Sequence, residues 1–207
     1  MQNRFFVAGY RIFFAILTLA AIVVQYEQAT LKGGGLNFFF FFTVESNILA
    51  ALLFLISAAG ALAGKRSQNF ALLRGAAVVY MVVTGGIYLT LLSGLEESLQ
   101  TTIPWVNSVL HYIMPVVVLA DWIVDPPVVS IHWRRALWWL LFPAVYGIVS
   151  LVRGSLSGWY PYPFLNPTSG GYGQVAIMMV IVCAVVLGVI GLVVFFSQVR
   201  QRVSSRK

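Results

Sequence analysis

Long apolar stretches alternate with short polar connections along the whole chain. Six of these stretches reach about 18 or more residues, the length that an α-helix needs to cross the hydrocarbon core of a bilayer. They cover Phe5–Val24, Phe38–Leu62, Ala71–Leu92, Pro104–Val124, Arg135–Val152 and Gln174–Phe196. Helices of this length satisfy their own backbone N–H and C=O groups inside hydrocarbon. The pattern predicts an all-α polytopic membrane protein, a single domain over residues 1–207 built as a bundle of six transmembrane helices.

The composition supports a membrane protein and excludes several other classes. Hydrophobic residues make up 60% of the 207 positions and charged residues 9%, whereas soluble proteins average about 45–50% and about 25%. The net charge of +7 does not indicate a nucleic-acid partner, because no basic face with stacking aromatics and no recognisable module accompanies it.

Residue types that hold metals or cofactors are scarce. The single cysteine, Cys183, lies in an apolar run and predicts neither an internal disulfide nor a cysteine metal site. The two histidines, His111 and His132, belong to different parts of the chain, so we expect no metal. No phosphate loop or dinucleotide motif is present, so we expect no cofactor.

The basic residues predict how the bundle sits in the membrane. With six spans, Lys32 and Arg153 fall on one side and eleven basic residues fall on the other. The eleven are Arg4, Arg11, Lys65, Arg66, Arg74, Arg134, Arg135, Arg200, Arg202, Arg206 and Lys207. Because cytoplasmic loops carry the excess of Lys and Arg, we expect both termini in the cytoplasm.

Polar side chains inside the spans are the candidates for function. Arg11 in the first span and Asp121 in the fourth both lie near the cytoplasmic side, where we expect a structural ion pair. In the second span Thr43, Ser46 and Asn47 share one helical face, whereas Glu45 points elsewhere.

Thr43 and His111 are expected at the same depth. At 1.5 Å per residue, Thr43 lies roughly 9 Å beyond Asn37 and His111 roughly 10 Å beyond Pro104. Asn107 shares the face of His111, and Tyr88 in the third span lies near this level. Two interpretations stay open: a catalytic pair in which the histidine activates the threonine hydroxyl, or a structural polar network that joins spans two, three and four.

The connection between spans five and six is rich in proline and aromatic residues. It runs from Gly158 to Pro167 and includes Tyr162-Pro163-Phe164-Leu165. This composition predicts either a compact segment folded over the outer mouth of the bundle or an interfacial aromatic belt.

Taken in chain order, these features resemble one known family. They are the six spans, Phe-Phe-Thr43 with the polar run behind it, Asn107 and His111 in span four, and Tyr162-Pro163-Phe164-Leu165 after span five. In this order they are similar to the androgen-induced-gene family of membrane proteins, which includes the androgen-dependent regulator of tissue factor pathway inhibitor.

The resemblance implies an intramembrane threonine hydrolase whose substrates are fatty acid esters of hydroxy fatty acids. It implies that Thr43 is the nucleophile and His111 its partner. As substrate or oxyanion contacts we expect Asn107, Asn47 and Tyr88, with Arg153 holding a carboxylate at the rim. The alternative is a non-enzymatic lipid-binding membrane protein or a small carrier.

The short N-terminus and short loops favour a bacterial protein. We therefore expect it to be integral to the plasma membrane, with the site towards the outer leaflet. The expected partner is a membrane lipid or a fatty acid ester, and the sequence leaves the oligomeric state open.

Overall fold

The computed structural model describes residues 4–64, 68–97, 99, 101–127, 130–168 and 170–204, and the side chains of residues 68, 69 and 201–204 are outside this description. Six helical stretches are long and apolar enough to span a membrane. They are Arg4–Leu31, Phe42–Leu62, Phe70–Leu92, Pro104–Val124, Trp133–Ser157 and Gly171–Arg200. The predicted all-α bundle with six membrane-spanning segments is confirmed.

Several of these spans consist of more than one helical element. The elements in chain order are α1 (Arg4–Leu31), the 3-10 helix η1 (Gly35–Phe40), α2 (Phe42–Leu62), α3 (Gln68–Ile87), the π-helical turn η2 (Tyr88–Leu92), α4 (Pro104–Ser108), the π-helical turn η3 (Val109–Ile113), α5 (Met114–Val124), α6 (Trp133–Ala136), the 3-10 helix η4 (Leu137–Leu140), α7 (Leu141–Ser157), the 3-10 helix η5 (Pro163–Leu165) and α8 (Gly171–Ser204).

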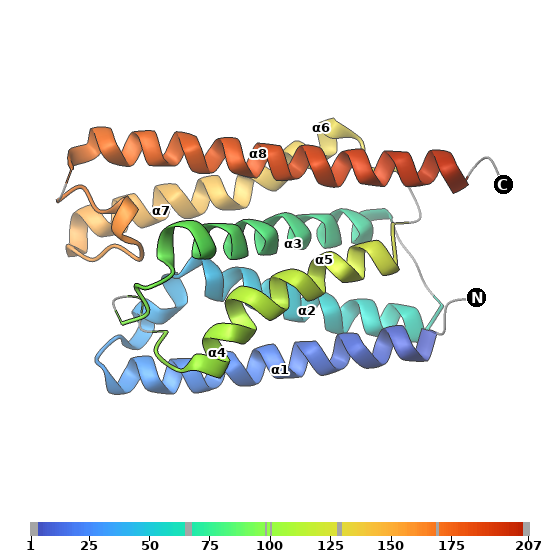
Figure 1. Cartoon of the computed structure of the whole chain (residues 1–207), viewed down its shortest axis with the longest axis horizontal. Helices are drawn as coiled ribbons and strands as arrows, with labels where there is room; N and C mark the ends of the chain where they lie inside the picture. Colours follow the sequence, from blue (N-terminus) through green and yellow to red (C-terminus); the bar gives the residue numbers. More distant parts are fainter. Residues whose placement is uncertain are drawn as a thin grey trace.

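Helix α3 lies at the centre of the bundle. It packs against α2, α5 and α8, and α1 packs along α2. Figure 1 shows α7 and α8 on one side of α3, with α1, α2, α4 and α5 on the other. Both chain termini lie at the same end of the bundle, which we name the terminal end. The opposite end, named the distal end, carries the described connecting residues 32–41, 93–97, 101–103 and 158–168.

The second span begins differently from the prediction. The apolar run from Phe38 reads as continuous helix, but Phe41 has an extended backbone (φ −82°, ψ 128°), and α2 begins only at Phe42. The carbonyl of Phe41 accepts the N–H groups of Val44 and Glu45 at 2.9 and 3.2 Å. Thr43 therefore lies in the first turn of α2, and the expected depth, which assumed an unbroken helix from Phe38, is wrong for this segment.

The fifth span extends beyond its predicted limits at both ends. It begins at Trp133 and ends at Ser157, where Gly158 follows with a φ of +72° and donates its N–H to the Gly154 carbonyl. A left-handed glycine directly after the last turn is a common helix terminator, because a side chain there is strained. Hydropathy does not detect this kind of stop signal.

A buried ionic network joins α1, α3 and α5 near the terminal end. Arg11 Nε lies 2.6 Å from Asp121 Oδ1, and Arg11 Nη2 lies 2.7 Å from Asp125 Oδ2. Arg74 Nη2 lies 2.6 Å from Asp121 Oδ2, and the Tyr10 hydroxyl donates to the same carboxylate. The predicted Arg11–Asp121 ion pair is confirmed and, among the residues that the structure describes, is one part of a network of two arginines and two aspartates.

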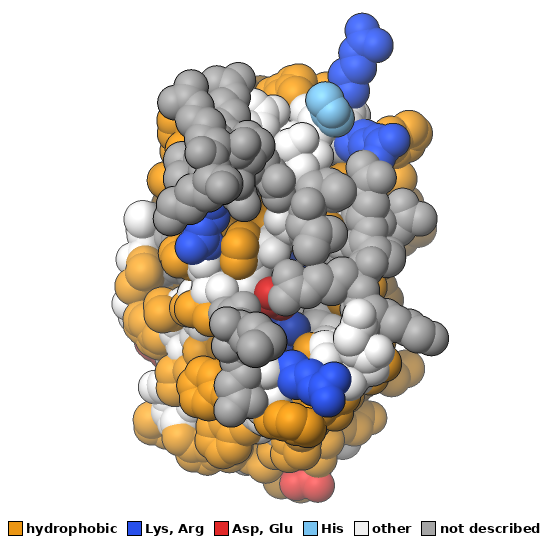
Figure 2. Space-filling model, turned by 90° about the vertical axis from the view of Figure 1, so that its right-hand side faces the viewer, with side chains coloured by type: hydrophobic (Ala, Val, Ile, Leu, Met, Phe, Trp, Pro, Cys, Tyr) orange, Lys and Arg blue, Asp and Glu red, His pale blue; other side chains and the backbone are white. Residues whose placement is uncertain are grey.

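The described basic side chains follow the predicted bias. Arg4, Arg11, Arg74, Arg134, Arg135 and Arg200 belong to the terminal end, whereas Lys32 and Arg153 belong to the distal end. Figure 2 views the terminal end and shows Lys and Arg side chains among hydrophobic ones. Lys65, Arg66, Arg206, Lys207 and the Arg202 side chain lie outside the described residues. Which side of a membrane this end faces stays a prediction.

Candidate active site

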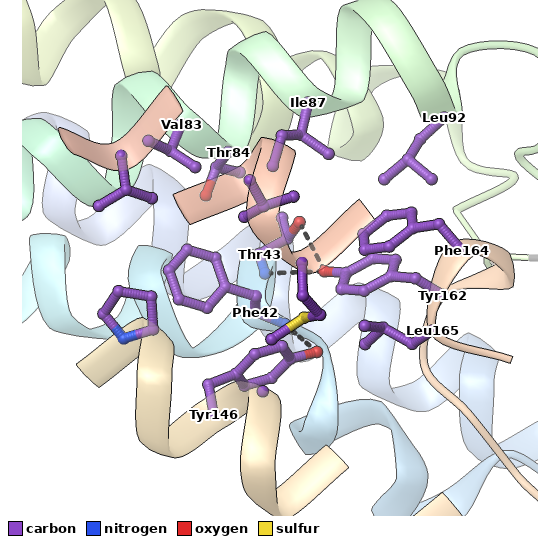
Figure 3. A pocket seen from close by; sticks show the side chains of 15 residues that line it. Phe42, Thr43, Val83, Thr84, Ile87, Leu92, Tyr146, Tyr162, Phe164 and Leu165 are labelled. Atoms are coloured by element: carbon purple, nitrogen blue, oxygen red, sulfur yellow. Dashed lines mark hydrogen bonds between the residues drawn. The ribbon is translucent and has the colours of Figure 1, made fainter. Parts of the chain in front are cut away.

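Thr43 lies in the first turn of α2, where two tyrosines approach from other elements. The Tyr162 hydroxyl accepts the Thr43 N–H at 3.3 Å and lies 3.5 Å from Thr43 Oγ1. The Tyr146 hydroxyl accepts the Phe42 N–H at 3.3 Å and donates to the Phe40 carbonyl at 2.9 Å. The first N–H groups of a helix have no partner within the helix, and Figure 3 shows these two satisfied by the tyrosines.

The predicted polar face of α2 is buried and joins three elements. Ser46 Oγ lies 3.0 Å from Thr84 Oγ1 in α3. Asn47 Nδ2 donates to the Thr43 carbonyl at 2.8 Å and to the Leu110 carbonyl in η3 at 3.1 Å. Glu45 lines a different pocket, in agreement with the prediction that it points elsewhere, and it is half-buried. The Asn47 amide thus holds α2 against η3 and also contacts the backbone of Thr43.

His111 lies in η3, and its ring is held on two sides. Nδ1 lies 3.2 Å from the backbone carbonyl of Asn107, and the Tyr88 ring stacks on the imidazole with centroids 3.9 Å apart. With the neutral ring donating from Nδ1 to this carbonyl, Nε2 is the acceptor nitrogen. No described residue forms a hydrogen bond with Nε2. The contact therefore leaves the basic nitrogen available.

Both rings of this stack belong to π-helical turns, Tyr88 to η2 and His111 to η3. Pro115 follows His111 by four residues and has no N–H to bond the His111 carbonyl, which removes one α-helical hydrogen bond at this point. Such turns are rare and occur often at functional sites. Here the two π-helical turns carry Tyr88 and His111, whose rings stack on each other across the two spans.

The close approach of these two spans depends on Gly85. A Cβ at this position would lie 3.0 Å from Pro115 Cβ and 3.3 Å from the His111 carbonyl oxygen, whereas a Cβ at Gly86 would meet nothing within 4 Å. Alanine at either position gains helix propensity, about 1 kcal/mol. Only at Gly85 does it also overpack the interface, which typically costs about 1–3 kcal/mol.

We expect Gly85→Ala to lower the thermal midpoint in detergent relative to Gly86→Ala. The shared gain in helix propensity cancels between the two variants, so the difference reports the contact with Pro115 and His111. Equal midpoints for the two variants would contradict the tight packing at Gly85.

Thr43 and His111 line the same small cavity, of about 20 Å³. Both side chains are buried, with exposed fractions of 8% and 3%. No hydrogen bond joins the two side chains. We name this space the Thr43–His111 cavity. The structure thus brings Thr43 and His111 to one cavity, although the route that the backbone takes to Thr43 differs from the prediction.

A second, apolar cavity of about 70 Å³ also contacts Thr43. It lies between α2, α3, α7 and α8 and is closed at the distal end by the segment after α7 (Figure 3). Thr43, Leu92 and Tyr162 line both cavities. The threonine therefore lies between the cavity that His111 lines and the larger apolar cavity.

The segment after α7 packs into the bundle. Tyr162 and Leu165 are buried, the Tyr162 ring stacks on Phe164 with centroids 5.2 Å apart, and Trp159 packs edge-on against Phe41. Of the two alternatives for this connection, the structure shows the compact segment, which packs into the distal end of the bundle. Burial raises the pKa of the Tyr162 phenol, so this hydroxyl stays protonated and can donate.

Tyr162 is the residue near Thr43 to which sequence reasoning assigned no role. The sequence feature that contains it is Tyr162-Pro163-Phe164-Leu165, which contributes to the family resemblance but does not by itself relate Tyr162 to Thr43. Because this segment follows Thr43 by more than a hundred residues, its position over the threonine depends on how the helices pack.

Asn107 and Tyr88 contact each other and a residue from the loop after η2. Asn107 Nδ2 donates to the Tyr88 hydroxyl at 2.6 Å, and this hydroxyl donates to Glu96 Oε1 at 2.9 Å. The Gly94 N–H also donates to Glu96 Oε1, and these bonds hold the pKa of the carboxyl below its ordinary value. The structure brings Asn107 and Tyr88 to His111, whereas Thr43 is approached by Tyr162.

Arg153 lies apart from both cavities at Thr43. Its guanidinium lies 4.0 Å from the Phe40 ring centroid and 4.9 Å from that of Trp159, and it donates to Asn37 Oδ1. Lys32, the other distal basic residue, donates to Thr102 Oγ1 at 3.1 Å.

Within the described part of the chain, no group of three or more His, Cys, Asp or Glu side chains is arranged to hold a metal ion. The fold and this site define a polytopic membrane protein with a buried threonine and histidine at one end of its bundle. Comparisons of the chain with protein-family models, with curated proteins and with solved structures find no match.

Proposed function

We propose that the protein is an intramembrane hydrolase of lipid esters in which Thr43 is the nucleophile and His111 the general base. The observation that carries this proposal is the cavity that both side chains line. A threonine hydroxyl is a weak nucleophile and needs a positioned base. A neutral imidazole that uses Nδ1 for its own helix leaves Nε2 for this task.

The first chemical step joins Thr43 to the acyl group. Thr43 Oγ1 attacks the ester carbonyl carbon, while its proton passes to Nε2 of His111, directly or through one water. The cavity volume of about 20 Å³ suffices for one water molecule. The negative charge that develops on the carbonyl oxygen needs a donor, and the Tyr162 hydroxyl, 3.5 Å from Thr43 Oγ1, is the neutral donor nearest the nucleophile.

The second step releases the acid. The imidazolium returns its proton to the leaving alkoxide as the carbon–oxygen bond breaks, which leaves an acyl-threonine. Water then attacks the acyl carbon with His111 again as base, and Thr43 recovers its proton. The products are an alcohol and a carboxylic acid.

The apolar cavity supports a lipid acyl chain as the group that is transferred. It opens against Thr43 and is lined chiefly by aliphatic and aromatic side chains from α3, α7, α8 and the segment after α7. The resemblance implies fatty acid esters of hydroxy fatty acids as the substrates to test first. Such esters carry two long apolar chains and one free carboxylate, so they partition into a bilayer and reach an intramembrane site through the lipid.

The orientation and location belong to the same proposal. The described basic residues gather at the terminal end, so the positive-inside rule puts this end in the cytoplasm and the site towards the outer leaflet. The short connections between the spans support a bacterial plasma membrane. A reporter enzyme that is active only in the cytosol, fused to the carboxyl terminus, tests this orientation. We expect the fusion to be active.

Covalent labelling tests the nucleophile. We expect an alkyl fluorophosphonate to label the purified wild-type protein and to leave Thr43→Ala unlabelled, because the probe reacts with an activated hydroxyl. Thr90→Ala is the matched control, since Thr90 is exposed and bonds only the carbonyl of Gly86 in its own helix. Labelling that persists in Thr43→Ala would exclude this residue as the nucleophile.

An unlabelled wild-type protein would favour the alternative, a lipid-binding protein or carrier. One observation favours this alternative: the Thr43 hydroxyl contacts Tyr162 rather than His111. A carrier would exchange labelled lipid across vesicles, and Thr43→Ala would retain this exchange.

A further inference from the structure

A surface groove of about 500 Å³ runs between α2 and α7, separate from the cavities at Thr43. Helix α2 contributes Glu45, Ile48 and Leu49, and α7 contributes a continuous face from Phe142 to Ser150. Tyr146 lines this groove and also the apolar cavity, so it forms part of the wall between them. Most of the groove is apolar and half-exposed, as expected for a surface in contact with lipid.

Two opposite charges flank this groove. Glu45 lies within it, in the first turn of α2. Arg153 follows Ser150 by three residues and so lies on the same face of α7, about 4.5 Å further towards the distal end. Its guanidinium covers the ring of Phe40, which also lines the groove.

Neither charge has an ionic partner among the described residues. The Glu45 carboxylate forms no hydrogen bond or ion pair there, and the Arg153 guanidinium donates to an amide and lies over two aromatic rings. Ionisable side chains within membrane spans are costly unless they are paired, and they mark functional sites by default. Because Glu45 and Arg153 do not pair with each other, a ligand that carries both charges satisfies both at once.

Deeper in the groove the lining is wholly apolar. Ile48 and Leu49 follow Glu45 by about one turn of α2, and Val145 and Phe142 lie about two and three turns of α7 before Arg153. The groove is thus charged in its distal half and apolar towards the middle of the bundle. This order matches a lipid, with a charged headgroup and an apolar chain.

We propose that this groove binds a phospholipid with a phosphoethanolamine headgroup. Arg153 contacts the phosphate through Nη1, which has no hydrogen-bond partner among the described residues, while Nη2 donates to Asn37. The carboxylate of Glu45 accepts hydrogen bonds from the primary ammonium. A choline headgroup has no N–H to donate, and a glycerol headgroup has no positive charge. The bound lipid lies against Tyr146, on the far side of the wall from Thr43.

Lipid binding to the purified full chain tests the proposal. Dioleoyl lipids with ethanolamine, choline or glycerol headgroups are added separately to the protein in detergent, and the bound fraction is read by native mass spectrometry. We expect the ethanolamine lipid to bind roughly tenfold more tightly than the other two, since hydrogen bonds to charged groups are the stronger kind. Equal binding of the three lipids would overturn the proposal and indicate a shell of unselected lipid.

Variants of Glu45 locate the selectivity. Glu45→Gln is expected to abolish the preference for the ethanolamine lipid, whereas Glu45→Asp, which retains the charge, is expected to keep it. Glu27→Gln is the matched control, because Glu27 is an exposed acid on α1. A preference that survives in Glu45→Gln would overturn the assignment. The comparison of three lipids on the wild-type protein decides the question even if a variant does not fold.

Discussion

Replacement of His111 by alanine is expected to lower kcat for hydrolysis of a fatty acid ester of a hydroxy fatty acid by about two to four orders of magnitude. General-base catalysis by a positioned side chain contributes about 10²–10⁴-fold, and this variant removes the proposed base. We expect KM to change little, because His111 is absent from the lining of the apolar cavity. Release of the free acid, measured by mass spectrometry across a range of substrate concentrations, separates the two parameters.

His132→Ala is the matched control for this experiment. His132 is exposed and precedes α6, near the terminal end of the bundle. An unchanged kcat in His111→Ala together with an inactive Thr43→Ala would assign the base to another group. A raised KM with an unchanged kcat would make His111 a binding residue instead.

Asp121→Ala is expected to destabilise the protein by about 3–5 kcal/mol, the usual cost of removing one partner from a buried ion pair. Asp121 has an exposed fraction of 4% and accepts hydrogen bonds from Tyr10, Arg11 and Arg74. Among the described residues, its loss leaves Asp125 as the ionic partner of both Arg11 and Arg74, so that the buried positive charges there exceed the negative ones. Unfolding in detergent, followed by circular dichroism, measures the change.

A double variant tests whether the charges act as one network. Arg11→Met with Asp121→Leu removes one charge of each sign and leaves Arg74 beside Asp125, with Nη1 and Oδ2 3.5 Å apart. We expect this variant to be more stable than Asp121→Ala, since replacing a buried ion pair by apolar side chains is often neutral. Glu27→Ala, on the exposed side of α1, is the control. Additive losses would contradict a coupled network.

The start of α2 illustrates the limit of hydropathy. The apolar run from Phe38 predicts helix, and the break at Phe41 leaves no trace in it, because an extended backbone changes no side chain's hydrophobicity. The break places the N–H groups of Phe42 and Thr43 where the hydroxyls of Tyr146 and Tyr162 accept them. These tyrosines come from α7 and the segment after it, too distant in sequence for a local pattern to relate them to Thr43.

In the candidate site too, some features follow from spacing along the chain and others depend on how the helices pack. Helical spacing alone predicted the shared face of Thr43, Ser46 and Asn47, and a depth estimate predicted the common level of Thr43 and His111. The stack of Tyr88 on His111 and the hydrogen bond from Tyr88 to Glu96 depend on two π-helical turns and on the close approach at Gly85. Which side chains of neighbouring spans meet is a question of rotation and packing, which spacing within one span does not answer.

The six spans and the gathering of basic residues at one end can be read from the linear chain, because length, hydropathy and charge are local properties of each segment. The ionic partners of Arg11 beyond Asp121, the Tyr162 hydroxyl beside Thr43 and the groove that contains Glu45 emerge only in the folded bundle. Each of these joins elements that are brought together by helix packing. Membrane helices of similar hydropathy can pack in many ways, and the interlocking of small residues and polar contacts between them selects one arrangement.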